Sequence, residues 1–281
     1  MRYITLIVLL CVAPLVSAAS FQEVVVRGGN YMIIATGEIQ DSDRDRLRNI
    51  FVRRKAFPVI TRLKTTGGSP EAAMALGQLY RDASIAVLAD EGCDTACFLW
   101  LVGGTSRAVN NDVTLTGKVM QQRAVKRYLE DMDIEKETQS PWQQTQTVLT
   151  AAGFAEQVGE RPAAVERWMN ESCGKLSEED NENFRALQAA SFLEALQRLA
   201  EKREDDSELQ PIIARQEALA ARAETLSNEE KLALQERWFK LRACKESYIA
   251  ERQQAFMEQL KRELAEEKAA KAAQATSAPA R

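Results

Sequence analysis

The feature that most constrains this chain is an apolar segment, residues 59–63, that runs into Gly67-Gly68 and then into Ser69-Pro70. Serine followed by proline is typical of a helix start, because the hydroxyl caps free backbone amides and proline fits the first turn. The two glycines permit a sharp turn just before it. A strand that leads at once into a helix is half of a β-α-β unit, so the sequence favours an α/β fold.

The chain on either side of this unit alternates in the same way. Apolar runs at 31–35, 59–63, 85–88 and 109–115 predict buried strands, and the segments 42–55, 69–82 and 98–102 predict helices. Strands separated by helices form parallel sheets. We therefore expect an α/β domain over residues 20–135.

Beyond Gln121 the sequence predicts helices only. Ser140-Pro141 and Arg161-Pro162 are typical helix starts. Gly153 and Gly174 are expected to end the two helices that begin there. The expected parts are a helical region packed on the core over 136–205, a long amphipathic, coiled-coil-like extension over 206–268, and a disordered tail over 269–281. The extension either mediates self-association or folds back on its own domain.

Residues 1–19 have the pattern of a signal peptide. Arg2 is followed by an almost wholly apolar run over 4–16, and both Val16-Ser17-Ala18 and Ser17-Ala18-Ala19 place small residues where signal peptidase cuts. The apolar run is shorter than the roughly 20 residues that span a membrane. We expect export to the periplasm, or secretion, and no transmembrane segment after the leader is removed.

Composition excludes some classes of partner. The chain has 37 Lys and Arg against 41 Asp and Glu, a net charge of −4, so it lacks the basic surface that nucleic-acid binding needs. No glycine pattern typical of nucleotide binding appears, and we expect no cofactor and no metal.

Four cysteines remain after the leader: Cys93, Cys97, Cys173 and Cys244. Thiols in an oxidising compartment tend to pair, and four cysteines allow three connectivities. We favour Cys93–Cys97 with Cys173–Cys244 over the alternatives. The spacings do not fit a compact zinc site. A Cys93–Cys97 bond requires a strand-to-helix turn, because that spacing is difficult to bridge on a regular helix.

Two turns carry the candidate chemistry, the one at Gly67-Gly68 and the one at residues 93–97. Backbone amides at a helix start can bind an oxyanion or a phosphate. The second turn places the hydroxyl of Thr95 at the start of a hydrophobic helix, beside the amide of Ala96. The simpler interpretation is a pair of tight turns. The chain contains no histidine, so no Ser-His-Asp triad and no Cys-His pair can form.

The stretches 34–39, 65–74, 93–97 and 103–107 (IATGEI, TTGGSPEAAM, CDTAC and GGTSR) resemble the Clp-protease/crotonase superfamily. The likeness is greatest to its exported, ClpP-like bacterial members, in which a serine lies between two cysteines. It covers roughly residues 31–120 and implies a ClpP/crotonase-like ββα-type spiral core, here with an all-α C-terminal extension. It also implies that Gly68, next to Gly67, and Ala96 hold the oxyanion positions, that Thr95 stands at the nucleophile position, and that a homo-oligomer can form.

The departures from the family matter as much. Threonine replaces serine, and no histidine occurs near residues 118–120. The nearest carboxylates, Asp131 and Asp133, are expected on a solvated helical face. Lys118 is the one candidate base, provided that burial lowers its pKa.

Two functions from different classes follow. In the first, the chain is a catalytically inactive ClpP-like protein that acts by binding a peptide or protein, or by assembly. In the second, it is an exported peptidase or acyl hydrolase that uses a Thr95–Lys118 dyad. A third hypothesis treats the α/β domain as a scaffold and the long helix as the functional part.

Overall fold

The chain forms two compact units. In this computed structural model, residues 19–26, 29–90, 92–134, 145–159, 161–201 and 209–277 are described. Unit 1 contains the described residues up to Val165 together with those from Arg252 onward, and unit 2 is Glu166–Glu251.

Unit 1 is built on a five-stranded sheet in the order β1-β2-β3-β4-β5. The strands are β1 (Ser20–Val25), β2 (Tyr31–Ile39), β3 (Ile60–Gly68), β4 (Ala86–Ala89) and β5 (Arg107–Val109). Strands β2 to β5 are parallel, and β1 pairs antiparallel with β2 at the edge. The expectation of an α/β fold with a parallel sheet is confirmed.

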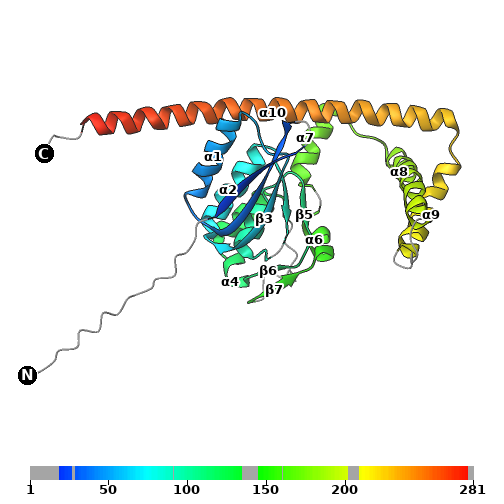
Figure 1. Ribbon diagram of the computed structural model, residues 1–281, viewed down its shortest axis with the longest axis horizontal. Coiled ribbons are helices and arrows are strands. Elements are labelled where there is room, and N and C mark those ends of the chain that lie inside the picture. Colours follow the sequence, from blue (N-terminus) through cyan, green and yellow to red (C-terminus); the bar gives the residue numbers. More distant parts are fainter. Residues whose placement is uncertain are drawn as a thin grey trace, which may run out of the picture. The chain divides into compact units, whose positions relative to one another are not determined.

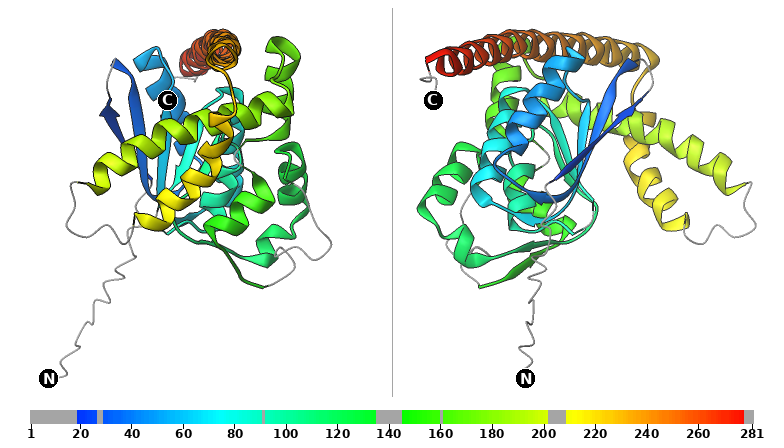
Figure 2. Two further views of the ribbon diagram at one scale, coloured as in Figure 1. Left: turned by 90° about the vertical axis from the view of Figure 1, so that its right-hand side faces the viewer. Right: turned by 60° about the vertical axis from the view of Figure 1, so that its left-hand side comes forward.

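The parallel strands are connected by α1 (Asp43–Arg54), α2 (Pro70–Asp82) and α3 (Thr95–Leu101). Because each connection leads to the next strand of the sheet and such crossovers are right-handed, the connecting helices lie on one face. Figures 1 and 2 show α1 and α2 on the same side of the sheet.

The core of unit 1 lies between this face and the helices. Ile33 and Ala35 of β2 are buried, and the helices contribute Phe51, Tyr80 and Trp100, all fully buried. Tyr80 and Trp100 meet edge to face, with ring centroids 5.2 Å apart. This contact packs α2 against α3.

The strand predicted over 109–115 is two strands. Strand β5 ends at Val109, and β6 (Val113–Leu115) pairs with β7 (Thr147–Leu149) in a separate antiparallel sheet. The amide groups of Asn110 and Asn111 donate to the Asp90 carboxylate (2.7 Å) and to its backbone carbonyl (3.0 Å). These bonds hold the connection against the end of β4, so the chain leaves the main sheet there. Strand β7 was not predicted, because three residues carry no measurable alternation.

The next helices along the chain are α4 (Gly117–Met120), α5 (Arg123–Asp131), α6 (Ala151–Val158) and α7 (Ala163–Cys173). Most of α7 belongs to unit 2. Gly153 lies inside α6 and does not end it. The helix ends instead at Gly159, which has φ +61° and donates to the carbonyl of Ala155. The helix start predicted at 140–141 lies outside the described residues, whereas Pro162 and Gly174 flank α7 as the sequence predicts.

Helix α10 (Asn228–Ser277) divides between the two units, so 206–268 is not a separate extension. In unit 1, Met257 and Leu260 join the core, Phe256 stacks on Phe57 at 6.0 Å, and Gln253 donates to the Ala83 carbonyl at 2.9 Å. The helix also continues through part of the predicted tail, since alanine and charged residues favour helix. This half of α10 is therefore folded back on the α/β core.

Unit 2 contains α8 (Glu178–Ala200) and α9 (Gln210–Glu224), which pair as a helical hairpin (Figure 1). Leu196, Leu209 and Ile213 form its small apolar cluster. Phe184 stacks on Trp238 of α10, with ring centroids 4.6 Å apart.

A disulfide connects the end of α7 to the part of α10 in unit 2. It joins Cys173 to Cys244, the second pair favoured from the sequence. Next to it, the Lys245 ammonium bonds to the Asn170 side chain at 3.0 Å and to the Glu166 carboxylate at 3.3 Å. The bond closes a sequence separation of 71 residues, which restricts the unfolded chain strongly.

The close packing behind the site leads to a first prediction. A Cβ on Gly103 would lie 2.2 Å from the Gly77 carbonyl oxygen in α2. Gly103→Ala should therefore destabilise the protein by about 1–3 kcal/mol, measured as a fall in Tm. The control is Gly153→Ala, where the nearest atom to the new Cβ would be 3.4 Å away. That change should be neutral or stabilise by about 0.5–1 kcal/mol, and equal effects of the two changes would contradict the prediction.

Candidate functional site

The two turns singled out in the sequence lie side by side at the carboxyl ends of β3 and β4. Gly67 is buried, and a Cβ built on it would lie 3.5 Å from Oδ2 of Asp94. The fold thus places Gly67 beside Asp94 of the 93–97 turn.

Gly68 has a conformation that other residues rarely adopt. Its φ is +125°, and a Cβ on it would lie 2.3 Å from the carbonyl oxygen of Ile39 at the end of β2. Ser69 then caps α2, its hydroxyl accepting a hydrogen bond from the Ala72 amide at 3.1 Å, with Pro70 in the first turn. The helix start predicted from Ser69-Pro70 is confirmed.

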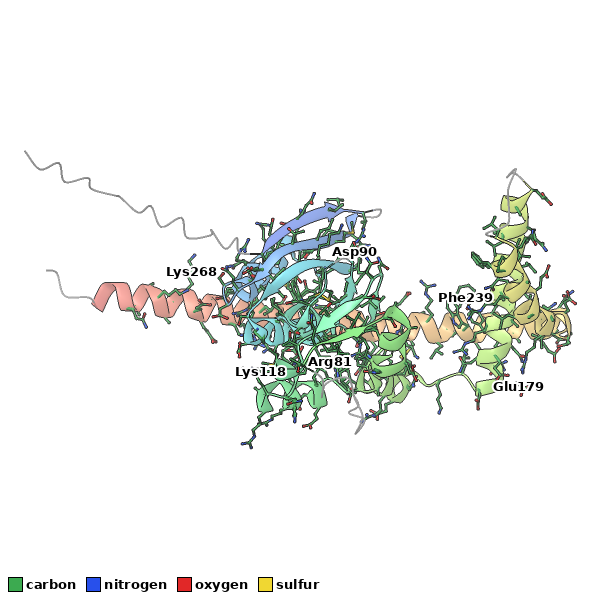
Figure 3. All side chains as sticks on the ribbon, turned by 90° about the horizontal axis from the view of Figure 1, so that it is seen from below. Arg81, Asp90, Lys118, Glu179, Phe239 and Lys268 are labelled. Carbon is green, nitrogen blue, oxygen red and sulfur yellow. A yellow bond between two sulfur atoms is a disulfide. The ribbon has the colours of Figure 1, made fainter. Side chains whose placement is uncertain are left out.

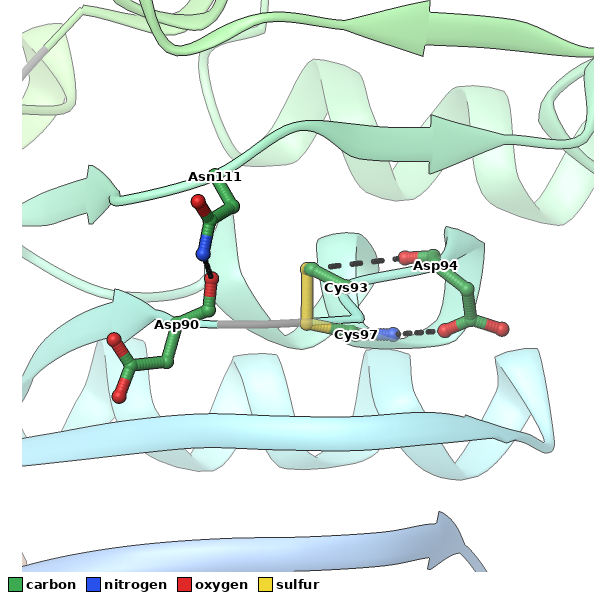
Figure 4. Close-up of a disulfide and its surroundings, with 5 residues drawn as sticks. All are labelled: Asp90, Cys93, Asp94, Cys97 and Asn111. Atoms are coloured by element: carbon green, nitrogen blue, oxygen red, sulfur yellow. Dashed lines mark hydrogen bonds between the residues drawn. A yellow bond between two sulfur atoms is a disulfide. The ribbon is translucent and has the colours of Figure 1, made fainter.

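The 93–97 turn is closed by a disulfide (Figure 4). Cys93 and Cys97 are joined with their Cα atoms 5.2 Å apart, and both are buried. Asp94 between them has extended backbone, at φ −101° and ψ −167°, and α3 begins only at Thr95. The bond therefore spans a strand-to-helix turn, the geometry that the spacing required.

The side chain of Asp94 caps α3 and was missed in the sequence. Its Oδ1 accepts a hydrogen bond from the Cys97 amide at 3.0 Å, and the carboxyl group also interacts with the Ala96 amide. Ala96 was the expected second oxyanion donor. An aspartate directly before a hydrophobic helix is a typical N-cap, so the sequence did contain the signal for this cap. The adjacent Thr95 was considered instead because its hydroxyl is a candidate nucleophile.

Asp94 is an unusual cap because it is poorly solvated. Burial raises the pKa of its carboxyl group, and the charge of Glu38 raises it further, while hydrogen bonds from the Cys97 and Ala96 amides act in the opposite direction. Burial has the largest effect. The amides at the start of α3 thus face a partly buried carboxyl group.

Thr95 is buried at the first position of α3. Its Oγ1 accepts a hydrogen bond from the Thr116 amide at 2.7 Å, which ties the start of α3 to the end of β6. Among the described residues, no lysine or arginine side chain bonds to this hydroxyl. Within the described part of the chain, the hydroxyl therefore has a backbone partner and no bonded lysine or arginine.

Lys118, the candidate base, lies in α4 with an exposed side chain (Figure 3). The condition set for it, burial of the side chain, is not met. Asp133 is engaged elsewhere, its Oδ2 accepting from the Arg81 guanidinium at 3.1 Å and from the Ala164 amide at 2.9 Å. Asp131 is exposed at the end of α5. The structure does not assemble these residues around Thr95.

A separate polar cluster surrounds Asp90 at the end of β4. Its carboxylate accepts hydrogen bonds from Arg62 and Asn110, and the Lys64 ammonium lies 3.7 Å away. Burial would raise the pKa of Asp90, but the bonds from Asn110 and Arg62 outweigh it and lower the pKa. Every charge here has a partner, so the cluster stabilises the strand end.

An open depression of about 680 Å³ lies directly beside Gly68. It is lined by Glu38, Ile39, Gln40, Asp41, Ser42, Gly68 and Ser69. Two carboxylates and two hydroxyls make this surface polar and acidic. It lies at the carboxyl ends of parallel strands, where α/β proteins commonly bind ligands.

The described part of the chain contains no group of three or more His, Cys, Asp or Glu side chains placed to hold a metal ion. None of its helices combines the length and the apolar character needed to cross a membrane.

The sequence matches no protein-family model and no curated protein at a significant level. Among solved structures, it is similar to a single-residue mutant of a protein described as "1510-N membrane-bound stomatin-specific protease". The TM-score is 0.34 and the identity 15%, over 50% of this chain and 83% of that one. At this TM-score the likeness assigns neither a family nor an activity.

The desolvated Asp94 leads to a prediction about pH. Its folded pKa is raised above the unfolded value of about 3.9, so the wild type loses stability as pH rises through the folded pKa. Asp94→Asn, neutral at every pH, does not share this loss. The unfolding free energy of the variant minus that of the wild type should therefore increase between about pH 3 and pH 7, as measured by denaturant titration.

Asp90→Asn is the matched control with the opposite sign. The folded pKa of Asp90 is lowered, so its stabilising charge is present above the unfolded pKa and is lost as pH falls through the folded pKa. The same free-energy difference should decrease as pH rises. Parallel trends in the two variants would show that Asp94 is not desolvated.

Proposed function

We propose that this chain is an exported, ClpP-like protein that binds a peptide or protein partner and does not hydrolyse it. The ClpP-like assignment comes from the four sequence stretches around the two turns. The observation that carries the loss of hydrolysis is the position of Asp94, whose carboxyl group occupies the amides at the start of α3.

Acyl transfer needs free hydrogen-bond donors where the oxyanion develops. The amides of Ala96 and Cys97 already face a carboxyl group, which in its ionised form would repel an incoming oxyanion. The second requirement, a base beside the hydroxyl, fails as well, because Thr95 accepts from a backbone amide and Lys118 is exposed. Both losses oppose the Thr95–Lys118 dyad.

The depression beside Gly68 is the place that we assign to the ligand. It adjoins the first turn at Gly68, and its acidic lining by Glu38 and Asp41 favours a segment with basic side chains. Unit 2 offers a second kind of surface: Phe192, Leu232 and Phe239 are at least half exposed. Exposed apolar side chains of this size support association with another protein or another copy.

Export is supported by the leader pattern and by the cysteines. All four cysteines that follow the leader are paired in disulfides, as expected for the periplasm or an extracellular compartment.

The absence of hydrolysis is tested on the purified mature protein. A fluorophosphonate probe should not label it, and fluorogenic ester and amide substrates should not turn over above the buffer rate. Thr95→Ala should behave identically in both assays. Labelling or turnover that disappears in Thr95→Ala would establish a hydrolase and overturn the proposal.

Ligand binding is tested by selecting displayed random peptides on the same protein. Selected peptides should be enriched in Lys and Arg, and Asp41→Lys should weaken their binding at least about tenfold, since it reverses a charge in the depression. Asp112→Lys, an equal charge change at an exposed residue outside the depression, should leave binding unchanged. Equal binding by the two variants would exclude this surface.

A further inference from the structure

The two disulfides of the described residues lie in different surroundings. Cys93 is 3% exposed and Cys97 is fully buried, and both belong to the hydrophobic core of unit 1. Cys173 and Cys244, in unit 2, are half-buried and belong to neither of the apolar clusters that the described residues form. The second bond is therefore more open to solvent than the first.

The chain next to Cys173 leaves room for another molecule. Cys173 is the last residue of α7, and Gly174 after it has φ +77°, where a Cβ would face open space. Ser172 and Lys175 on either side of this pair are exposed. Thiol–disulfide exchange needs an attacking thiolate to reach a sulfur atom, and the end of α7 permits that approach.

Unit 2 also has less apolar packing to keep this region closed. Its apolar cluster consists of Leu196, Leu209 and Ile213 with partly buried neighbours, and it does not include the disulfide. Local opening of a sparsely packed region costs less free energy than opening the core of a domain. The Cys93–Cys97 bond, in contrast, becomes accessible only when the core of unit 1 opens.

We propose that Cys173–Cys244 is a site of thiol–disulfide exchange with an external dithiol, whereas Cys93–Cys97 is a permanent structural bond. A thiolate of the dithiol attacks one sulfur, the Cys173–Cys244 bond breaks, and a mixed disulfide forms. The second thiol of the reagent then displaces the protein from that mixed disulfide. Two electrons and two protons pass in total, so the dithiol is oxidised to a disulfide and both cysteines become thiols.

The exchange changes how firmly the α8–α9 hairpin is held. The bond closes a sequence separation of 71 residues, and both helices of the hairpin lie within that loop. After reduction, Lys245 still bonds to Asn170 and to the Glu166 carboxylate, but these contacts are polar and partly exposed. Bonds of this kind add little stability, so the end of α7 is held to α10 mainly in the oxidised form.

The exchange is tested on the mature protein, purified in its oxidised form. The protein is treated with increasing dithiothreitol, new thiols are blocked with iodoacetamide, and alkylated cysteines are identified by peptide mass spectrometry. In the native protein, Cys173 and Cys244 should be alkylated together, at least about tenfold faster than Cys93 and Cys97. In guanidinium chloride the protection of Cys93 and Cys97 should be lost.

Three outcomes would overturn this assignment. They are equal rates for the two bonds in the native protein, faster opening of Cys93–Cys97, and no reduction of Cys173–Cys244 until the protein unfolds. None of these readouts involves ligand binding or hydrolysis by the chain, so the result stands apart from the proposed function.

The effect on unit 2 is tested by limited digestion with trypsin. Lys175 is exposed in the connection between α7 and α8. Reduction should speed cleavage after Lys175 at least about threefold, while cleavage in unit 1 stays unchanged. The double variant Cys173→Ser, Cys244→Ser should be cleaved at the faster rate with or without dithiothreitol. Equal cleavage of oxidised, reduced and variant protein would show that the bond does not hold the hairpin.

Discussion

The contact between the Asp94 carboxyl group and the first amides of α3 is the interaction on which the carboxyl edge of the sheet depends. It fixes where α3 begins, and Oδ2 of the same group lies against the position of Gly67. The disulfide closes the turn on the other side, and Thr95 ties it to the end of β6. Asp94, Thr95 and the disulfide together therefore fix the start of α3, which lies beside the end of β3 and is bonded to the residue after β6.

This arrangement also defines the chemistry of the edge. The Cys97 amide at the start of α3 donates to an internal acceptor, the Asp94 carboxyl group, and the Thr95 hydroxyl beside it accepts from a backbone amide. The free polar surface lies next to it, in the depression formed by the ends of β2 and β3. The function that we propose for such a surface is recognition rather than bond cleavage.

The sequence predicted the parts of the fold that local rules control. Some elements depend only on neighbouring residues and can therefore be predicted from the sequence. They are the turn at Gly67-Gly68, the cap at Ser69 and the apolar strands. Strand β7 could not be predicted, because its structure depends on pairing with β6. The packing partner of the C-terminal half of α10 could not be predicted either. Its stripe of apolar residues indicates that the helix packs on another element, but does not identify that element as the core of unit 1.

The sequence alone determined that no imidazole can serve as a base, that four cysteines lie beyond residue 19, and that the two turns start helices in an α/β domain. Only the tertiary structure decided which side chains are buried and which groups they contact. It placed Asp94 against the amide of Cys97 at the start of α3, left Lys118 exposed and folded the C-terminal half of α10 onto the core. The reason is physical: a residue's type fixes which bonds it can make, whereas burial and its partners depend on segments far away in the chain.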